Sequence, residues 1–290
     1  MFKLAAFTDE ISQDLARACQ VLAEFGGKGI EIRAVWDTRP EDLSDSQVAE
    51  IKKIVADHGL SVCSIGSPFG KCELDDSKAV AHHMDILKRC ADIARELDCP
   101  LVRGFAFWDP DQADQKPWKA MVKAYQPVPA ILKDKDILLG LENEASCYVG
   151  TASHIRTFMD LLKCDRVKAV WDPANHIHDP QSIAIPAFPD GYQLVRDDMV
   201  HVHVKDAGPD EAGVVQNRFM GTGLVHWENQ LQALKNDGYD GYISLETHVR
   251  AEEFPPELED TYGHYLAAGG KEGASKVCLA WLSDAMAALT

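Results

Sequence analysis

Short apolar runs rich in β-branched residues alternate along the chain with longer segments in which apolar residues recur every three or four positions. After the first run, for example, Leu15, Cys19, Leu22 and Phe25 repeat with helical spacing. Buried strands that alternate with one-sided helices are typical of parallel βαβ units. The predicted strands are Leu4–Thr8, Gly29–Val35, Ser61–Ser67, Leu101–Phe107, Ile137–Glu142, Lys168–Asp172, Met199–Lys205 and Tyr242–Thr247.

Eight strands in strict alternation with helices predict a closed barrel rather than an open sheet. A doubly wound sheet seldom keeps so regular a pattern over 290 residues, whereas a (β/α)₈ barrel often forms one unit of this size. Ser44 is a suitable helix N-cap, and Gly26 and Gly59 stand where helix ends need left-handed backbone. The sequence therefore predicts an α/β protein, a single (β/α)₈ TIM barrel domain over residues 1–290.

Other segments refine this picture. Prolines interrupt the helical pattern in residues 118–135 and 182–198, and residues 273–289 are expected to form the eighth helix. Residues 207–223 and 249–270 are expected to be long loops after the last two strands. Such βα loops surround the reactive face of a barrel.

Composition and charge narrow the class of ligand. The chain has 46% hydrophobic residues, as a sizeable core requires, and a formal net charge of −17. This charge opposes binding to nucleic acid or to an anionic membrane face, so a small molecule is the expected partner. No stretch approaches the roughly 20 apolar residues of a membrane span, and we expect a cytoplasmic protein. The eight cysteines form no CxxC pair and are expected to be buried free thiols.

Ionisable residues stand at the carboxyl ends of four consecutive predicted strands. They are Glu142 in LGLENEA, Asp172 in AVWDPAN, His203 in VHVHVKD and Glu246 in ISLETH. Each lies about one βα unit after the one before it, with a glycine-containing loop lengthening the last interval. The carboxyl ends of barrel strands form the reactive face, and charge is tolerated there only beside solvent or a partner. We therefore expect these four side chains to converge at the barrel mouth.

Three carboxylates that lie close together are stable as anions only if a cation neutralises part of their charge. Like charges in a small volume repel one another by several kcal/mol at an effective dielectric constant of about 20. Glu142, Asp172, His203 and Glu246 are therefore predicted to hold one divalent metal ion, although each alone would fit a helix cap or an ion pair. The oxygen-rich set favours Mn²⁺, with Mg²⁺, Co²⁺, Fe²⁺ and Zn²⁺ as alternatives. His201 faces the same side of its strand as His203, one layer deeper, where it is expected either to bond a neighbour or to support the metal ligand.

Motifs along nearly the full chain resemble the xylose isomerase-like barrel superfamily, a group of sugar-phosphate isomerases and epimerases that includes ketose 3-epimerases and inosose dehydratases. The motifs are AAFTDEISQD near the N-terminus, GIEIR at 29–33, LENE at 141–144, WDPAN at 171–175, HVHVKDA at 201–207 and GYDGYISLE at 238–246. The resemblance is specific for the fold and the metal site and unspecific for the substrate.

The resemblance also implies roles for residues. The four strand-end residues match the family's metal ligands, and in the sugar epimerases the residues at Glu142 and Glu246 also exchange the substrate proton on opposite faces of an enediolate. Ketose 3-epimerases usually carry a histidine three residues after the metal-binding aspartate and an arginine six residues after the metal-binding histidine. This chain has Asn175 and Pro209 there, which separates it from the epimerases of that type.

Four further residues near the predicted mouth are expected to contact substrate: Asn175, Lys205, Trp108 and His248. Asn175 can hydrogen-bond a sugar hydroxyl, and the Trp108 indole can stack on the apolar face of a sugar ring. Lys205 can steady a carbonyl oxygen or a phosphate, although a surface ion pair with Asp206 would explain it equally well. His248 can serve as a second acid or base, although a solvated loop histidine is the simpler interpretation.

Three charged residues on earlier strands receive structural interpretations. Glu31 and Arg33 in GIEIR are expected to form a salt bridge inside the barrel, with orientation of the substrate as the alternative. Arg103 is also expected to be structural.

The leading hypothesis is a divalent-metal-dependent sugar or sugar-phosphate isomerase or epimerase that moves a proton beside a carbonyl through a metal-bound enediolate. The first alternative is a metal-dependent lyase or dehydratase acting on a keto-sugar, by inosose dehydration or 3-keto-glycoside cleavage. The second is a barrel that binds sugar without catalysis. The sequence leaves open which sugar binds, whether it is phosphorylated, and whether the chain forms a homo-oligomer.

Overall fold

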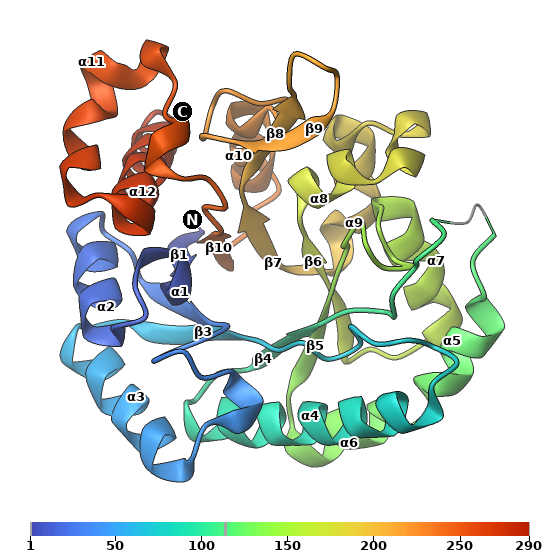
Figure 1. Cartoon of the computed structure of the whole chain (residues 1–290). Coiled ribbons are helices and arrows are strands. Elements are labelled where there is room, and N and C mark those ends of the chain that lie inside the picture. The colour runs from blue at the N-terminus through green and yellow to red at the C-terminus, as the bar shows by residue number, and fades with distance from the viewer. Residues whose placement is uncertain (1, 113–114, 290) are drawn as a thin grey trace.

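The computed structural model describes residues 2–112 and 115–289. In this part of the chain eight parallel strands close into a barrel that helices surround (Figure 1). Around the barrel the strands follow the order β1-β10-β7-β6-β5-β4-β3-β2. The strands are β1 (Lys3–Phe7), β2 (Gly29–Ile32), β3 (Ser61–Gly66), β4 (Leu101–Gly104), β5 (Leu138–Glu142), β6 (Val167–Trp171), β7 (Met199–Val204) and β10 (Tyr242–Leu245). The predicted (β/α)₈ barrel is confirmed.

Two strands end three residues earlier than the sequence pattern indicated. β2 ends at Ile32 and β4 ends at Gly104, three residues before the predicted ends in both cases. After β4 the Phe105 N–H donates to Phe69 O, so the backbone leaves the barrel ladder and bonds to the loop that follows β3. Apolar residues beyond these ends are buried under loops, which is why their pattern resembled a longer strand.

Helices cover the outside of the barrel and bury one apolar face each. The longer ones are α2 (Leu15–Glu24), α3 (Asp45–Asp57), α4 (Ser77–Glu96), α7 (Ala152–Leu162), α10 (Trp227–Asn236) and α12 (Gly270–Ala287). The shorter ones are α1 (Thr8–Ile11), α5 (Trp118–Ala124), α6 (Val128–Lys135), α8 (Pro173–His178), α9 (Tyr192–Val195) and α11 (Glu259–Tyr262).

Local sequence signals set several helix ends. Ser44 begins α3 with a capping box, in which its side chain accepts from Gln47 N and the Gln47 side chain accepts from Ser44 N. Gly26 and Gly59 have positive φ angles of 75° and 66°, as predicted for the ends of α2 and α3. The prolines in residues 118–135 divide that segment into α5 and α6, also as predicted.

Both segments expected to be long loops contain regular structure, so that expectation is wrong. Residues 207–223 hold most of a hairpin of β8 (Asp206–Pro209) and β9 (Val215–Arg218), which pair antiparallel. Residues 249–270 hold the short helices η5 (Ala251–Glu253), η6 (Pro256–Leu258), α11 and η7 (Gly263–Ala268). These elements are short and polar, so they lack the apolar periodicity that marks a strand or helix in the sequence.

The base of the β8–β9 hairpin is held by one carboxylate. Asp206 accepts hydrogen bonds from the backbone N–H groups of Ala207, Gly221, Gly223 and Val225. Glycine is required at 223 because a Cβ there would lie 2.2 Å from Asp206 Oδ1. The hairpin is therefore fixed at the point where it leaves β7.

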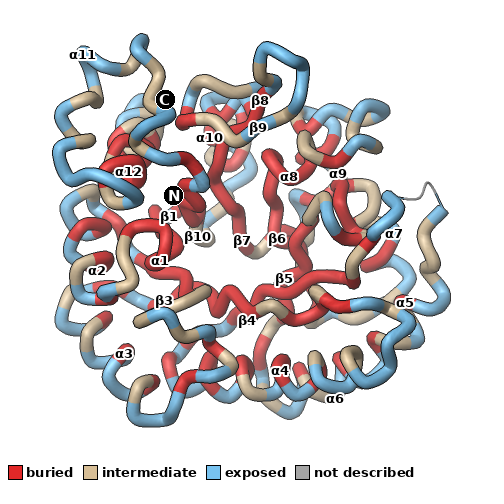
Figure 2. The backbone as a smooth tube through the Cα atoms, viewed as in Figure 1, coloured by how far each residue is buried: buried red, intermediate tan, exposed pale blue. Residues whose placement is uncertain are grey.

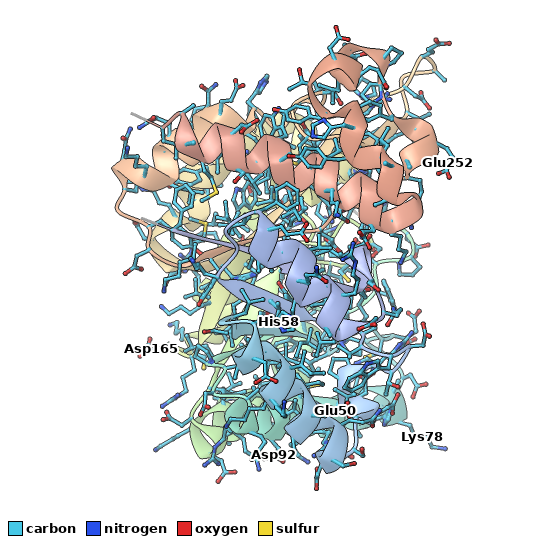
Figure 3. All side chains as sticks on the ribbon, turned by 90° about the vertical axis from the view of Figure 1, so that its left-hand side faces the viewer. Glu50, His58, Lys78, Asp92, Asp165 and Glu252 are labelled. Carbon is cyan, nitrogen blue, oxygen red and sulfur yellow. The ribbon has the colours of Figure 1, made fainter. Side chains whose placement is uncertain are left out.

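Burial follows the expected barrel pattern. The strands are buried and the outer faces of the helices are exposed (Figure 2). Charged side chains such as Glu50, Asp92 and Asp165 project from the outer shell (Figure 3). All eight cysteines are free and seven of them are buried, as predicted. Within the two described ranges, no helix combines the length and the apolar character needed to span a membrane.

Candidate active site

The strand-end residues are placed by the strands and by short-range bonds. Asp172 follows β6 directly and caps α8, because its Oδ1 accepts from Asn175 N at 2.9 Å and Pro173 occupies the first helical position. The Asn143 side chain bonds both the Asp172 N–H and the Asp172 carbonyl, at 3.0 and 2.7 Å. Glu246 lies one residue beyond β10, where its N–H still donates to Val204 O. Asn175 in the WDPAN motif thus holds the Asp172 carboxylate, and Asn143 in the LENE motif holds the Asp172 backbone.

The structure brings together the four residues predicted from the sequence. One ligand-type atom from each of Glu142, Asp172, His203 and Glu246 lies within 4.8 Å of those of the other three. All four side chains are buried at the carboxyl ends of β5, β6, β7 and β10. The convergence inferred from their spacing is thus present in the fold.

Lys205 supplies a positive charge in this cluster. Its Nζ lies 2.9 Å from Asp172 Oδ2 and 2.8 Å from Glu246 Oε2, and the side chain is buried. The alternative of a surface ion pair with Asp206 is therefore wrong, because Asp206 is occupied with the hairpin backbone. Burial opposes the charged form of Lys205, but Asp172 and Glu246 outweigh it and raise the Lys205 pKa above its ordinary value.

A second buried cluster lies one layer deeper. Glu31 Oε2 lies 2.9 Å from His201 Nε2 and 3.2 Å from His203 Nε2, and Glu31 Oε1 accepts from Ser64 Oγ. Glu31 is fully buried, yet its pKa is well below the usual range because His203 and His201 outweigh the burial. The predicted salt bridge between Glu31 and Arg33 is wrong, since Glu31 points inward to the histidines.

Arg33 instead binds carboxylates at the mouth. Its guanidinium contacts Asp9, Glu10 and Glu246, the last at 2.6 Å between Nη1 and Oε1. His248 Nε2 lies 2.9 Å from the same Glu246 oxygen, and Glu246 raises the His248 pKa. Glu246 is therefore surrounded by cationic groups on its solvent side.

The three carboxylates differ in proton affinity. Burial raises the Asp172 pKa to about 6, although Lys205 opposes the rise. Burial acts on Glu246 as well, but Lys205 and His248 outweigh it and hold the Glu246 pKa well below its usual range. For Glu142, His203 and Arg103 outweigh burial and lower the pKa. Asp172 is thus the member of the cluster that is least stable as an anion.

His203 links the two clusters. Its Nδ1 lies 3.0 Å from Glu142 Oε1, while its Nε2 faces Glu31. Burial favours the neutral ring, but Glu142 and Glu31 together raise the His203 pKa to about 10. Metal binding by His203 would therefore be coupled to loss of a proton from the ring.

A cavity of about 460 Å³ opens over the cluster. Among the residues that line it are Glu142, Glu246, Asn175, Lys205 and His248. The Asn175 amide donates to Glu142 Oε1 at 3.1 Å, so three of the four predicted substrate contacts lie beside the cluster.

Trp108, the fourth predicted substrate contact, lines a neighbouring cavity instead. It pairs with Cys147 through an isolated β-bridge, and Lys71 Nζ lies 5.4 Å from the centre of its ring. Sequence reasoning missed Lys71 and its partner Glu144, whose Nζ and Oε2 atoms are 2.7 Å apart at the wall of the 460 Å³ cavity. No sequence signal marked Lys71, because it lies in a loop after β3.

The residues of the cluster fit a divalent cation. Asp172 Oδ2 is buried and lies 2.9 Å from Lys205 Nζ, so a cation already balances this oxygen in the cluster. Three carboxylates and one imidazole supply oxygen and nitrogen donors of the kind that Mn²⁺, Mg²⁺ and Zn²⁺ accept. The bond between Glu31 and His203 is the arrangement that commonly orients a metal-binding histidine.

Comparison with known proteins identifies the class of this barrel. Residues 19–266 match the family described as xylose isomerase-like TIM barrel, and the chain belongs to that family. The resemblance inferred from the sequence motifs is thus confirmed.

Within this class, solved structures resemble the chain over nearly its whole length. A D-allulose 3-epimerase from Methylomonas sp. has a TM-score of 0.70 and 19% identity, covering 98% of each chain. The IOLI protein, solved with a bound zinc atom, has a TM-score of 0.71 and 17% identity, covering 100% of this chain and 99% of its own. The 3-keto-D-glucoside 4-epimerase YcjR from E. coli has a TM-score of 0.69 and 17% identity, covering 98% and 100%. At these identities the similarity establishes the fold.

Proposed function

We propose that this protein is a divalent-metal-dependent isomerase or epimerase of a keto-sugar or keto-sugar phosphate. The observation that carries the proposal is a pair of buried carboxylates, Glu142 and Glu246, that line one cavity and lie close to Asp172 and His203 at the barrel mouth. Two of the similar structures described above are epimerases of sugars by name, which supports this class of reaction.

Glu142, Asp172, His203 and Glu246 would hold the ion. Mn²⁺ is proposed because carboxylate oxygens dominate the set, with Mg²⁺ and Zn²⁺ as the nearest alternatives. When bound, a divalent ion supplies Lewis-acid stabilisation of negative charge on the carbonyl and adjacent hydroxyl oxygens of the sugar.

The protein's own residues would move the proton. One of Glu142 and Glu246 takes the proton from the carbon beside the carbonyl, and the electron pair of the broken C–H bond moves to the carbonyl oxygen to give an enediolate. The other residue enters the step as the carboxylic acid, delivers its proton to the opposite face and restores the carbonyl; proton exchange of both groups with solvent then resets the site. Lys205, a buried cation between Asp172 and Glu246, favours negative charge on the oxygen during this step.

Solvent-deuterium incorporation tests the proposal. Ketoses, sugar phosphates, inososes and 3-keto-glycosides are incubated with the Mn²⁺-loaded protein in D₂O and followed by NMR and mass spectrometry. One class is expected to gain a deuterium beside its carbonyl without loss of mass from elimination. Glu142→Gln and Glu246→Gln are each expected to lower the rate by about 10²–10⁴-fold, and Glu228→Gln, on the exposed start of α10, to leave it unchanged. Unchanged exchange in Glu246→Gln would defeat the proposal.

Elimination is a second candidate because of His248. Its Nε2 lies 2.9 Å from Glu246 Oε1, and the side chain is 34% exposed at the cavity wall. A protonated histidine beside the base can donate a proton to a leaving group, as a lyase acting on a keto-sugar requires. In the same experiment a lyase would show loss of water or of an aglycone, and His248→Gln would slow that loss more than it slows deuterium exchange.

A further inference from the structure

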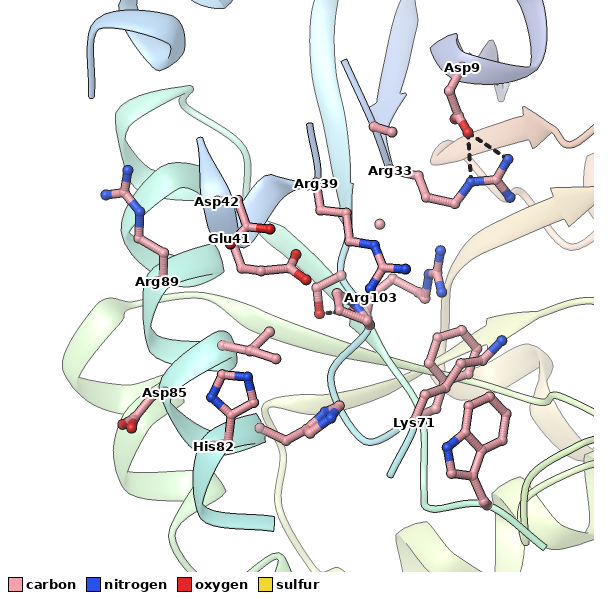
Figure 4. Close-up of a pocket in the computed structure, with 18 residues that line it drawn as sticks. Asp9, Arg33, Arg39, Glu41, Asp42, Lys71, His82, Asp85, Arg89 and Arg103 are labelled. Carbon is pink, nitrogen blue, oxygen red and sulfur yellow. Dashed lines mark hydrogen bonds and ion pairs between the residues drawn. The ribbon is translucent and has the colours of Figure 1, made fainter. Parts of the chain in front are cut away.

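A larger cavity of about 860 Å³ lies beside the candidate active site, next to the loops after β2, β3 and β4 (Figure 4). Its lining shares Arg33, Lys71, Arg103 and Phe105 with the lining of the 460 Å³ cavity, so the two adjoin. Each has the size of a pocket for a small molecule. Together they offer room for a ligand that extends beyond the keto-sugar unit at the metal cluster.

Cationic side chains gather at the end that adjoins the active site. Arg33, Arg39, Arg103 and Lys71 all line this cavity, and the side chains of Arg39 and Arg103 extend into the same part of it in the view of Figure 4. In a protein of net charge −17, this cavity is lined by slightly more basic than acidic side chains: Arg33, Arg39, Lys71, Arg89 and Arg103 against Asp9, Glu41, Asp42 and Asp85.

Acidic residues also line the cavity, and their positions matter. Asp9 is bonded to Arg33. Glu41 and Asp42 lie between Arg89 and Arg39 in Figure 4, and the Arg39 charge opposes the rise that burial gives the Glu41 pKa, whereas Asp85 lies farther out beside His82. The cavity is therefore mixed in charge, with Arg33, Lys71 and Arg103 on the side that adjoins the active site.

The four cations differ in how fully they are paired. Arg33 and Lys71 are bonded to carboxylates. The Arg103 side chain is only 7% exposed, and its Nε forms an ion pair with Glu142 Oε2 at 3.3 Å, while the side chain also lines the cavity. Arg39 is exposed, and its side chain has neither a hydrogen bond nor an ion pair within residues 2–112 and 115–289.

A buried guanidinium is costly unless its donors find acceptors, and a ligand in the cavity would supply acceptors for the Arg103 donors that do not face Glu142. The planar fork of arginine matches two oxygens of one phosphate or carboxylate, and two arginines that face one space can share such a group. Phe105 forms part of the wall, with the Arg103 guanidinium 4.5 Å and the Lys71 Nζ 4.2 Å from its ring centre, so both cations are held in place.

We propose that Arg39 and Arg103, with Lys71, form a subsite for an anionic group, a phosphate ester or a carboxylate, on the substrate whose keto-sugar part occupies the metal cluster. The inference rests on the proposed function for the identity of the sugar part. It assigns the substrate class as an anionic keto-sugar rather than a neutral one. The anion binds in the larger cavity, next to the metal cluster, because Arg103 also pairs with Glu142.

Calorimetric binding to the full chain tests the subsite without any turnover. Inorganic phosphate is titrated into the metal-free protein, which removes direct binding of phosphate to the ion. Saturable 1:1 binding is expected, weakened at least about tenfold in both Arg39→Gln and Arg103→Lys because each loses a charged fork. Arg95→Gln, an equal loss of charge on the exposed face of α4, is the matched control and is expected to bind phosphate as the parent does.

Paired sugars then identify the anion in the Mn²⁺-loaded protein. Tighter binding of D-ribulose 5-phosphate than of D-ribulose assigns a phosphate ester, and tighter binding of D-fructuronate than of D-fructose assigns a carboxylate. The proposal is overturned if neither anionic sugar binds better than its neutral partner, or if Arg39→Gln and Arg95→Gln bind phosphate equally. Arg39 is exposed, so its variant remains informative even where Arg103→Lys fails to fold.

The two proposals fail separately. Arginine-dependent phosphate binding without deuterium exchange in any sugar would support the anion subsite and contradict the proposed isomerase activity. Deuterium exchange in neutral ketoses without arginine-dependent anion binding would support the proposed isomerase activity and contradict the anion subsite.

Discussion

Replacement of Lys205 by methionine separates the roles of the lysine and the metal at the cluster. In the chain without metal, Lys205 Nζ is within 2.9 Å of both Asp172 and Glu246. Methionine has a similar length but no charge, so the substitution removes the lysine partner of Asp172 and leaves Glu246 with Arg33 and His248. A bound divalent ion would neutralise the same carboxylates, and the loss should then be smaller.

The expected loss of stability in Lys205→Met follows from the burial of the ion pair, and its effect on the melting temperature follows from the chain length. Removal of one partner from a buried ion pair destabilises a protein by about 3–5 kcal/mol. The entropy of unfolding is about 2.1 cal/mol/K per residue, so a chain of 290 residues has about 0.6 kcal/mol/K, and the metal-free variant should melt about 5–8 °C below the parent. The decrease should be largest near pH 8 and smaller near pH 5, because Asp172, with a pKa of about 6, takes up a proton in acid.

Scanning calorimetry measures the melting temperatures of the parent and the variant, first with a chelator and then with excess Mn²⁺. Mn²⁺ should raise the melting temperature of Lys205→Met more than that of the parent, because the variant offers the ion an unpaired site without a competing ammonium. Lys168→Met is the control: Lys168 pairs with Asp198 at 2.8 Å, but both side chains are more than a quarter exposed, so less than about 2 °C should be lost, with or without metal. An equal decrease in Lys205→Met with and without Mn²⁺ would refute the reasoning.

Three further outcomes are expected. Glu31→Gln should weaken Mn²⁺ binding about 10–100-fold, because it removes the carboxylate that orients His203, and a competition titration with a metal indicator measures this. Mn²⁺ affinity should rise from pH 5 to pH 8, because the ion displaces protons from Asp172 (pKa about 6) and His203 (pKa about 10); calorimetry in buffers of different ionisation enthalpy should show proton release, and its absence would argue against these ligands. Asn143→Ala should destabilise the fold by about 1–3 kcal/mol in denaturant titrations, because the Asp172 N–H and carbonyl lose their shared partner.

The sequence predicted the barrel because its local and global signals agree. Apolar strand runs, one-sided helices and capping residues such as Ser44 all favour the same alternation, and the structure follows it. The four cluster residues were predictable for a related reason. Parallel neighbouring strands end at one face, so equal intervals along the chain become proximity in space, as for Glu142 and Asp172.

Contacts across the barrel were less predictable. Glu31 on β2 bonds His201 and His203 on β7, two strands that are not neighbours in the barrel order. Spacing along the chain carries no information about such pairs, so Glu31 was assigned to Arg33. A better signal is available: a carboxylate in the middle of a predicted buried strand needs a partner from inside the barrel. The β8–β9 hairpin was missed because residues such as VQNR carry no apolar alternation.

The anchoring of the β8–β9 hairpin by Asp206 has an evolutionary consequence. Its four backbone bonds fasten the base of the hairpin, whereas the tip around Gly213 is exposed and a Cβ there would touch nothing within 4 Å. Insertions and deletions at an exposed turn are tolerated when its ends stay fixed. Descendants of this sequence can therefore lengthen or shorten the tip, and so diversify the rim of the barrel, while His203 and Lys205 at the base keep their positions.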